Sequence, residues 1–100
     1  MSKITESARG EQCQLRIPGI CTGNQETVVW CHAIGHASGK GIGKKSPDVL
    51  GAYGCQNCHD CYDRRTQTPS HLTRQEIEIC FSEGHQRSMR ILIEKGLVKV

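Results

Sequence analysis

Residues 55–63, which read CQNCHDCYD, decide the fold of this chain. Two cysteines stand in a CxxC spacing, and the polar residues that follow, without Gly or Pro, predict a helix over residues 56–66. Cys55 and Cys58 would then lie where a strand passes into a helix. Structural zinc sites take four thiolate or imidazole ligands in a tetrahedron, so this stretch predicts half of a zinc site.

Two upstream cysteines can supply the other half. Cys13 and Cys21 flank the pair Pro18-Gly19, which favours a tight turn and can bring the two thiols to one point. Their spacing is wider than in most zinc motifs, so ordinary buried thiols are the alternative to a metal site. Cys61 follows Cys58 by one helical turn and could replace Cys13 or Cys21 as a ligand.

Two other uses of the CxxC motif are excluded. Cys55-x-x-Cys58-His59 matches the motif for covalent attachment of c-type haem, but that chemistry needs an export route. The first residues, MSKITESARGEQ, have no apolar run of the kind that a signal peptide needs. A thioredoxin-like redox role is also excluded, because the βαβ pattern that normally surrounds it is absent.

His59 and Asp63 form a second candidate site on the same predicted helix. They are four residues apart and therefore project from one face. Neighbouring helical residues diverge by about 100°, so Cys58 can point toward a zinc while this pair points elsewhere. One imidazole and one carboxylate leave open positions on a divalent metal, as a catalytic site requires. A surface pair without metal is the alternative.

His32 is a candidate third residue of this site. It lies in residues 27–34, whose β-branched and aromatic side chains predict a strand, and residues 49–53 predict a second, antiparallel strand. If this hairpin packs on the helix, His32 can face His59 and Asp63. A neutral imidazole there can take a proton from an attacking water. A purely structural histidine in a strand is the alternative.

The C-terminal part predicts a long helix. Residues 73–76, TRQE, are a capping-box pattern, and apolar or small residues follow at helical spacing. This amphipathic helix should run to about Lys95 and end at Gly96. A short helix over residues 4–9 and an apolar tail over residues 97–100 complete the predicted elements.

Composition and charge limit the class of protein. The chain has 100 residues, only four of them aromatic, so we expect a single domain over residues 1–100 with a thin core that a metal would reinforce. Seven cysteines are an odd number and fit a disulfide framework badly, and no apolar run is long enough for a membrane span. We therefore expect a cytoplasmic location with reduced thiols, in which Cys31 and Cys80 are small buried hydrophobic residues. A net charge of +3 permits a nucleic-acid partner without requiring one.

The order His32, a glycine-rich insertion and Cys55-x-x-Cys58-His59-x-x-x-Asp63 resembles the HNH, or ββα-metal finger, nuclease motif. From ARGEQCQLRIPGIC (residues 8–21) to EKGLVKV (residues 94–100), the chain is similar to the small YbcO-like nucleases of lambdoid prophages. This resemblance implies an α+β fold, in which a zinc-stapled ββα-metal finger core of a β-hairpin and a helix precedes a long C-terminal amphipathic helix. It implies that His32 is the general base and that a catalytic Mg²⁺, Mn²⁺ or Zn²⁺ is held by His59 and Asp63. The structural zinc would be bound by Cys13, Cys21, Cys55 and Cys58.

Two positions depart from the HNH pattern. Cys31 stands where the motif usually carries a His or Asp metal ligand just before the base. Leu50 stands where the middle asparagine is expected, and Asp48 is the nearest polar substitute. The catalytic metal is therefore expected to be held by fewer side chains than usual.

Two groups of cations are candidates for contacts with DNA. One belongs to an exposed, Gly- and Lys-rich loop predicted over residues 35–47, and the other directly follows Asp63. Such cations can bind phosphates without reading bases, and a solvated surface is the alternative. The residues are Lys40, Lys44, Lys45, Arg64 and Arg65.

The favoured function is a metal-dependent DNA endonuclease, prophage-encoded, that hydrolyses phosphodiester bonds in phage DNA processing or recombination. DNA would be its substrate and phage recombination proteins its candidate partners. A non-catalytic zinc-binding DNA adaptor with the same fold is the alternative. A structural zinc domain for protein contacts is a third hypothesis, which leaves the basic loop without a role.

Overall fold

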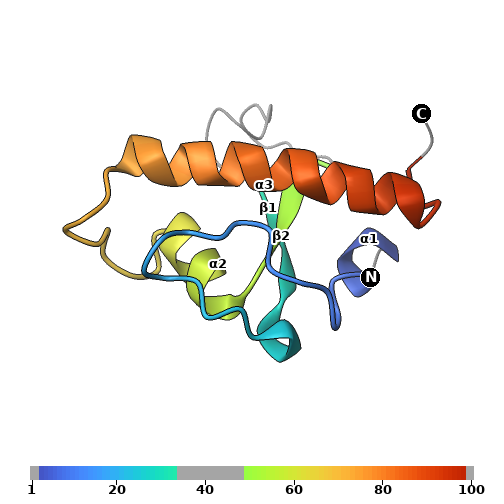
Figure 1. Cartoon of the computed structure of the whole chain (residues 1–100), viewed down its shortest axis with the longest axis horizontal. Coiled ribbons are helices and arrows are strands. Elements are labelled where there is room, and N and C mark those ends of the chain that lie inside the picture. Colours follow the sequence, from blue (N-terminus) through green and yellow to red (C-terminus); the bar gives the residue numbers. More distant parts are fainter. Residues whose placement is uncertain (1–2, 34–48, 99–100) are drawn as a thin grey trace, which may run out of the picture.

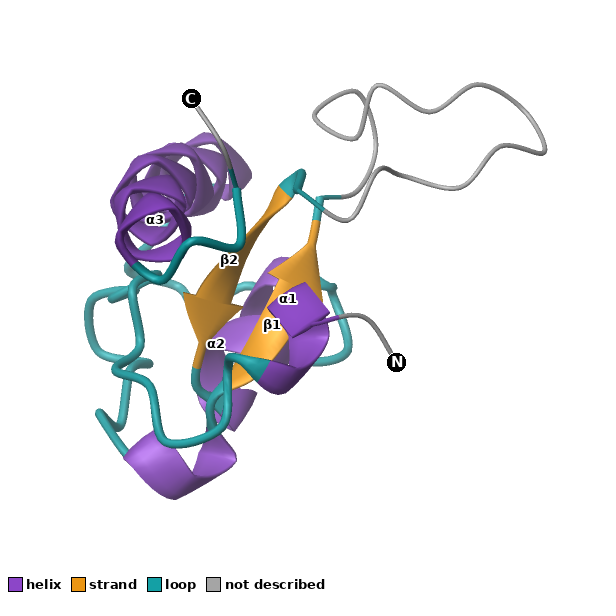
Figure 2. Cartoon of the chain, turned by 90° about the vertical axis from the view of Figure 1, so that its right-hand side faces the viewer, coloured by secondary structure: helices purple, strands orange, loops and turns teal. Residues whose placement is uncertain are grey.

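A computed structural model describes residues 3–33 and 49–98 of the chain. A two-stranded antiparallel sheet lies between α2 on one side and α3, which runs along its other side (Figure 1). Figure 2 shows α2 directly behind the two strands. The small α+β architecture with a hairpin, a following helix and a long C-terminal helix is therefore confirmed. The elements are α1 (Lys3–Glu6), the 3-10 helix η1 (Gln25–Thr27), β1 (Val29–His32), β2 (Gly51–Gly54), α2 (Gln56–Tyr62) and α3 (Arg74–Glu94).

The hairpin forms where the sequence predicts it, with shorter strands. Trp30 pairs with Tyr53 across the sheet, and their rings meet edge to face at 5.0 Å between centroids. The predicted strand over residues 27–34 begins too early, because the Asn24 side chain accepts a hydrogen bond from the Glu26 N–H and starts η1 instead. The second strand is also shifted toward α2 relative to the predicted residues 49–53.

The outer edge of β2 is closed by distant parts of the chain. The Tyr53 N–H donates to the hydroxyl of Ser88 on α3 at 3.0 Å, and the Tyr53 carbonyl accepts from the Gln14 N–H at 2.8 Å. His85, also on α3, binds the Gly51 carbonyl through Nδ1 at 2.7 Å. These bonds satisfy an edge that would otherwise present unpaired backbone groups.

Helix α3 begins and ends as its sequence signals predict. The Thr73 side chain accepts from the Glu76 N–H, and the Glu76 side chain accepts from the Thr73 N–H, which completes the capping box. Gly96 has a φ of +74°, the left-handed conformation that ends many helices. A Cβ on Gly84 would lie 2.8 Å from the Gln14 carbonyl, so only glycine allows this close approach.

Helix α2 is shorter than the predicted range of residues 56–66 and ends at Tyr62. The Arg65 N–H donates back to the Asp60 carbonyl at 2.9 Å, and Arg64 adopts a φ of +64°. This is a Schellman ending in which arginine takes the place usually held by glycine, at a cost of about 1 kcal/mol. The sequence carried no glycine to signal it.

The ends of the described chain also differ from expectation. Helix α1 covers Lys3–Glu6, whereas the sequence predicts residues 4–9. Leu97 and Val98, in the predicted apolar tail, are half-buried and pack against the core. Within the described ranges, no helix combines the length and apolar character needed to cross a membrane.

Candidate functional site

The four predicted zinc ligands gather at one place. The Sγ atoms of Cys13, Cys21, Cys55 and Cys58 all lie within 4.8 Å of one another, and three of the four residues are buried. The turn before Cys21 is tight, since its N–H binds the Ile17 carbonyl at 2.9 Å. Gly19 supplies the required positive φ of +73°. The four cysteines could therefore bind a metal such as zinc.

The spacing and the protonation of these thiols fit such a metal. Four Zn–S bonds of about 2.3 Å in a tetrahedron place sulfurs about 3.8 Å apart, which small side-chain rotations reach from the observed cluster. A hydrogen bond from Cys58 lowers the pKa of Cys13 to about 4, and the same contact raises the pKa of Cys58. Burial raises the pKa of Cys21 to about 11.

Cys61, the alternative ligand, is not part of this cluster. It is buried under α3, where Arg74 donates to its carbonyl at 3.4 Å. Cys31 is fully buried, as expected. Cys80 is half-buried and packs against the core.

His59 and Asp63 lie together on α2, as their spacing predicts. The Nε2 atom of His59 is 2.8 Å from Oδ2 of Asp63, and the two side chains are 17% and 19% exposed. The other ring nitrogen of His59, Nδ1, is buried and has no hydrogen-bond partner in the described part of the chain. A buried polar atom without a partner is unusual in a folded protein.

The negative charge of Asp63 affects the thiol of Cys31 on β1. Burial raises the pKa of Cys31 well above its ordinary value, and the negative charge of Asp63 raises it further. Helix α2 also contacts β1 directly. Burial and the charge of Asp63 both favour the protonated thiol of Cys31.

His32 ends β1 and is exposed, opposite Gly51 in the sheet register. Among the candidate DNA contacts, Arg64 is exposed, and Arg65 places its guanidinium 3.8 Å from both Asp60 and Asp63. The loop lysines Lys40, Lys44 and Lys45, together with Asp48, lie outside the described residues.

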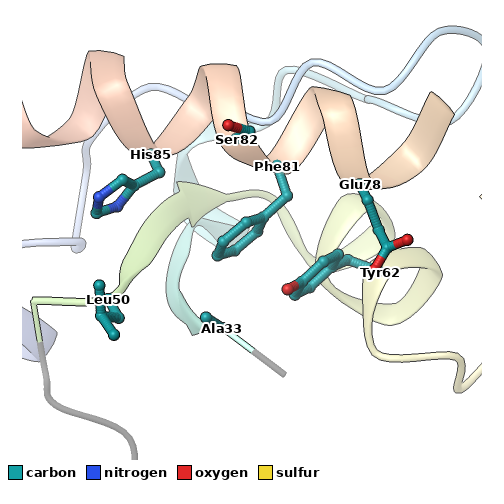
Figure 3. Close-up of a pocket in the computed structure, with 7 residues that line it drawn as sticks. All are labelled: Ala33, Leu50, Tyr62, Glu78, Phe81, Ser82 and His85. Carbon is teal, nitrogen blue, oxygen red and sulfur yellow. The ribbon is translucent and has the colours of Figure 1, made fainter. Parts of the chain in front are cut away.

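A small pocket lies beside these elements and was not predicted. It has a volume of about 150 Å³ between the open end of the hairpin, the last turn of α2 and one face of α3 (Figure 3). Glu78 and His85 contribute from α3 and are polar residues beside the apolar positions of an amphipathic helix. The sequence carried no signal for the pocket, because polar residues are expected beside the buried positions of an amphipathic helix.

Fold and site together define a small α+β protein with a cluster of four cysteines that could bind a metal and a histidine–carboxylate pair on helix α2. The chain belongs to the YbcO family: the family model described as "Putative nuclease YbcO" matches residues 2–97. This confirms the resemblance to the YbcO-like family.

Individual relatives match over their full length. The chain is 39% identical over 99 residues, 99% of both chains, to "Putative nuclease YbcO" of Escherichia coli strain K12 and equally to "Putative nuclease ybcO" of Enterobacteria phage 82. A solved structure, that of "a putative bacteriophage protein" from Escherichia coli, superposes with a TM-score of 0.73 at 37% identity. The match covers 92% of this chain and 98% of that chain.

Proposed function

We propose that this chain is a metal-dependent endonuclease of the HNH type that hydrolyses phosphodiester bonds in DNA. The observation that carries the proposal is the His59–Asp63 pair, held at 2.8 Å on helix α2, which contacts the strand that ends in His32. The four-cysteine cluster ties the start of the same helix to the rest of the fold. The names of the relatives support nuclease activity.

The pair fits a catalytic divalent metal. Two ligands at about 2.1 Å and at right angles to each other on Mg²⁺ would be about 3.0 Å apart, close to the observed separation of 2.8 Å. His59 and Asp63 would hold Mg²⁺, Mn²⁺ or Zn²⁺ and leave the other positions for phosphate and water. When bound, the cation neutralises charge on the phosphate and on the departing 3′ oxygen.

His32 would act as the general base. Its side chain is exposed at the end of β1, where a DNA phosphate can approach it. A neutral ring nitrogen of His32 takes the proton of the attacking water, and the ring then carries one positive charge next to the phosphate. The phosphates on either side would be held by Arg64 and Arg65, with Lys40, Lys44 and Lys45 as the loop contacts. These cations bind any sequence and make the affinity depend on salt.

A relative in a phage fits a role in phage DNA processing or recombination. In that role, phage recombination proteins would be the partners. The second candidate function is a non-catalytic zinc-binding DNA adaptor. Cys31 favours it, because a buried, protonated thiol stands where HNH motifs usually carry another metal ligand. Half-buried Leu50, at the place of the middle asparagine, favours it as well.

A plasmid-nicking assay separates the two functions. Zinc-loaded wild type is incubated with supercoiled DNA and Mg²⁺, Mn²⁺ or added Zn²⁺, next to His32→Ala. The endonuclease proposal requires relaxed or linear product with at least one metal for wild type and none for the variant. DNA binding without cleavage under every metal would establish the adaptor.

A further inference from the structure

The pocket of Figure 3 is large enough for one aromatic ring. Its volume is about 150 Å³, and cavities of that size hold a molecule such as benzene. The ring of Phe81 lies at its centre, with Glu78 beside Tyr62 and His85 beside Leu50. The lining is mainly apolar and comes from three elements that are distant in the sequence.

The pocket adjoins the proposed catalytic centre. Ala33, on its floor, directly follows His32, and Tyr62 directly precedes Asp63. Neighbouring Cα atoms are about 3.8 Å apart, so the pocket borders the backbone of both proposed catalytic residues. A nucleotide whose phosphate reaches His32 and Asp63 would carry its base to the mouth of this pocket.

The lining offers an apolar wall and hydrogen-bond acceptors. The rings of Tyr62 and Phe81 are stacked on each other at 4.1 Å with 7° between their planes, and at 1% and 6% exposure they close the inner wall of the pocket. His85 must donate through Nδ1 to the Gly51 carbonyl, so Nε2 of the neutral ring is an acceptor. The Glu78 carboxylate also only accepts, and its charge repels a phosphate.

We propose that this pocket binds one unstacked DNA base that carries an exocyclic amino group, such as cytosine, next to the scissile phosphate. The proposal rests on the endonuclease function proposed above. The cytosine amino group donates to the Glu78 carboxylate, whereas thymine has an oxygen acceptor at that position. A base in the pocket has left its duplex, so the preferred DNA contains an unpaired base.

Binding to matched DNA duplexes tests the proposal. Fluorescence anisotropy of zinc-loaded protein, without added catalytic metal, is measured on a duplex with one bulged cytosine, the same duplex with a bulged thymine, and the fully paired duplex. We expect wild type to bind the cytosine bulge about tenfold more tightly than the other two. Glu78→Gln should reduce this preference at least about threefold. Glu83→Gln, the same change of charge at another exposed position of α3, should leave it unchanged.

A second measurement places the base independently of cleavage. In NMR spectra of labelled protein, the cytosine-bulge duplex should shift the amide signals of Ala33, Leu50 and Tyr62, and the thymine bulge should shift them less. Equal affinities for the two bulges, or equal effects of Glu78→Gln and Glu83→Gln, would contradict the pocket proposal.

The endonuclease proposal is tested separately by cleavage. If wild type cleaves DNA without a cytosine preference, only the pocket proposal is wrong. If it shows the cytosine preference and these shifts but cleaves with no metal, only the endonuclease proposal is wrong. Absence of DNA binding would contradict both proposals.

Discussion

The Nε2 atom of His59 lies 2.8 Å from Oδ2 of Asp63, one turn further along α2. Asp60, between them in the sequence, serves a different partner, because its carboxylate accepts from the Gln56 side chain at 2.8 Å. Asp60 lies within α2 and Asp63 is the residue that caps its end, so their closest partners differ, although Arg65 lies 3.8 Å from both. This difference provides a matched pair for mutagenesis.

Asp63→Ala should reduce DNA cleavage about 100-fold or more, because one of two protein ligands of the proposed catalytic metal is lost. High Mn²⁺ should restore part of the rate, since the missing carboxylate lowers metal occupancy more than it changes the water chemistry. Asp60→Asn is the control and should cleave within about threefold of wild type. Initial nicking rates at several Mn²⁺ concentrations check this, and equal losses in the two variants would contradict it.

The four-cysteine cluster should contain about one zinc per chain, and its removal should unfold the domain, because so small a core gains folding free energy from the metal. Elemental analysis of protein purified without chelators measures the metal, and circular dichroism before and after chelation measures the fold. Cys58→Ser should lose the zinc, whereas Cys80→Ser, outside the cluster, should keep it. If wild type contains no zinc and its thermal stability is unchanged by chelation, the prediction of a structural zinc is wrong.

Zinc affinity should fall steeply as the pH falls. Burial raises the pKa of Cys21 to about 11, and the contact with Cys13 raises the pKa of Cys58, so both hold protons at pH 7 without the metal. Zinc must displace at least these two protons, and the affinity should therefore change by at least about 100-fold per pH unit between pH 6 and 8. Competition with a zinc chelator at three pH values measures the slope. A slope below one proton would contradict the assignment.

Local signals predicted the helices well at their marked ends. The capping box at Thr73 and the glycine at position 96 predicted the two ends of α3, and the structure agrees with both. Such signals can be read from sequence because they act through backbone groups within one turn. The end of α2 was not predicted, because no local signal in the sequence marks it. Arg64 adopts the left-handed conformation without a glycine, and only the surrounding structure imposes it.

The candidate site was predicted in part. The sequence gathers Cys13, Cys21, Cys55 and Cys58 through a turn and a CxxC spacing, and the structure brings them together. The sequence could not exclude Cys61 as a ligand, because helical spacing alone does not show which side of α2 packs against α3. The pocket and the closed edge of β2 depend on contacts between residues more than 30 positions apart, and such contacts leave no mark in local patterns.

Ser88→Ala should destabilise the protein by about 1–3 kcal/mol, because the Ser88 hydroxyl accepts the Tyr53 N–H at 3.0 Å in a fully buried place. Its removal leaves a buried backbone donor without a partner. Ser82→Ala, at an exposed position of the same helix, should change stability by less than about 0.5 kcal/mol. Urea unfolding of both zinc-loaded variants measures the difference, and similar values for the two would show that the hydroxyl contributes little to closing β2.

His32→Ala separates catalysis from binding. A general base acts in the transition state, so its removal should lower the cleavage rate by about 10² to 10⁴ while DNA affinity stays within a few-fold. The zinc content should also remain, since His32 is exposed at the end of β1 and is not one of the four clustered cysteines. His71→Ala is the control for the loss of an exposed imidazole elsewhere, although its ring binds the Pro18 carbonyl at 2.8 Å and its stability must be measured alongside. Cleavage rate, anisotropy with labelled duplex and zinc content are measured on the same preparations.

If His32→Ala cleaves as fast as wild type, another group accepts the proton and the assignment of the base is wrong. If it loses DNA affinity and cleavage in equal measure, His32 holds the phosphate in the ground state and does not act as the base.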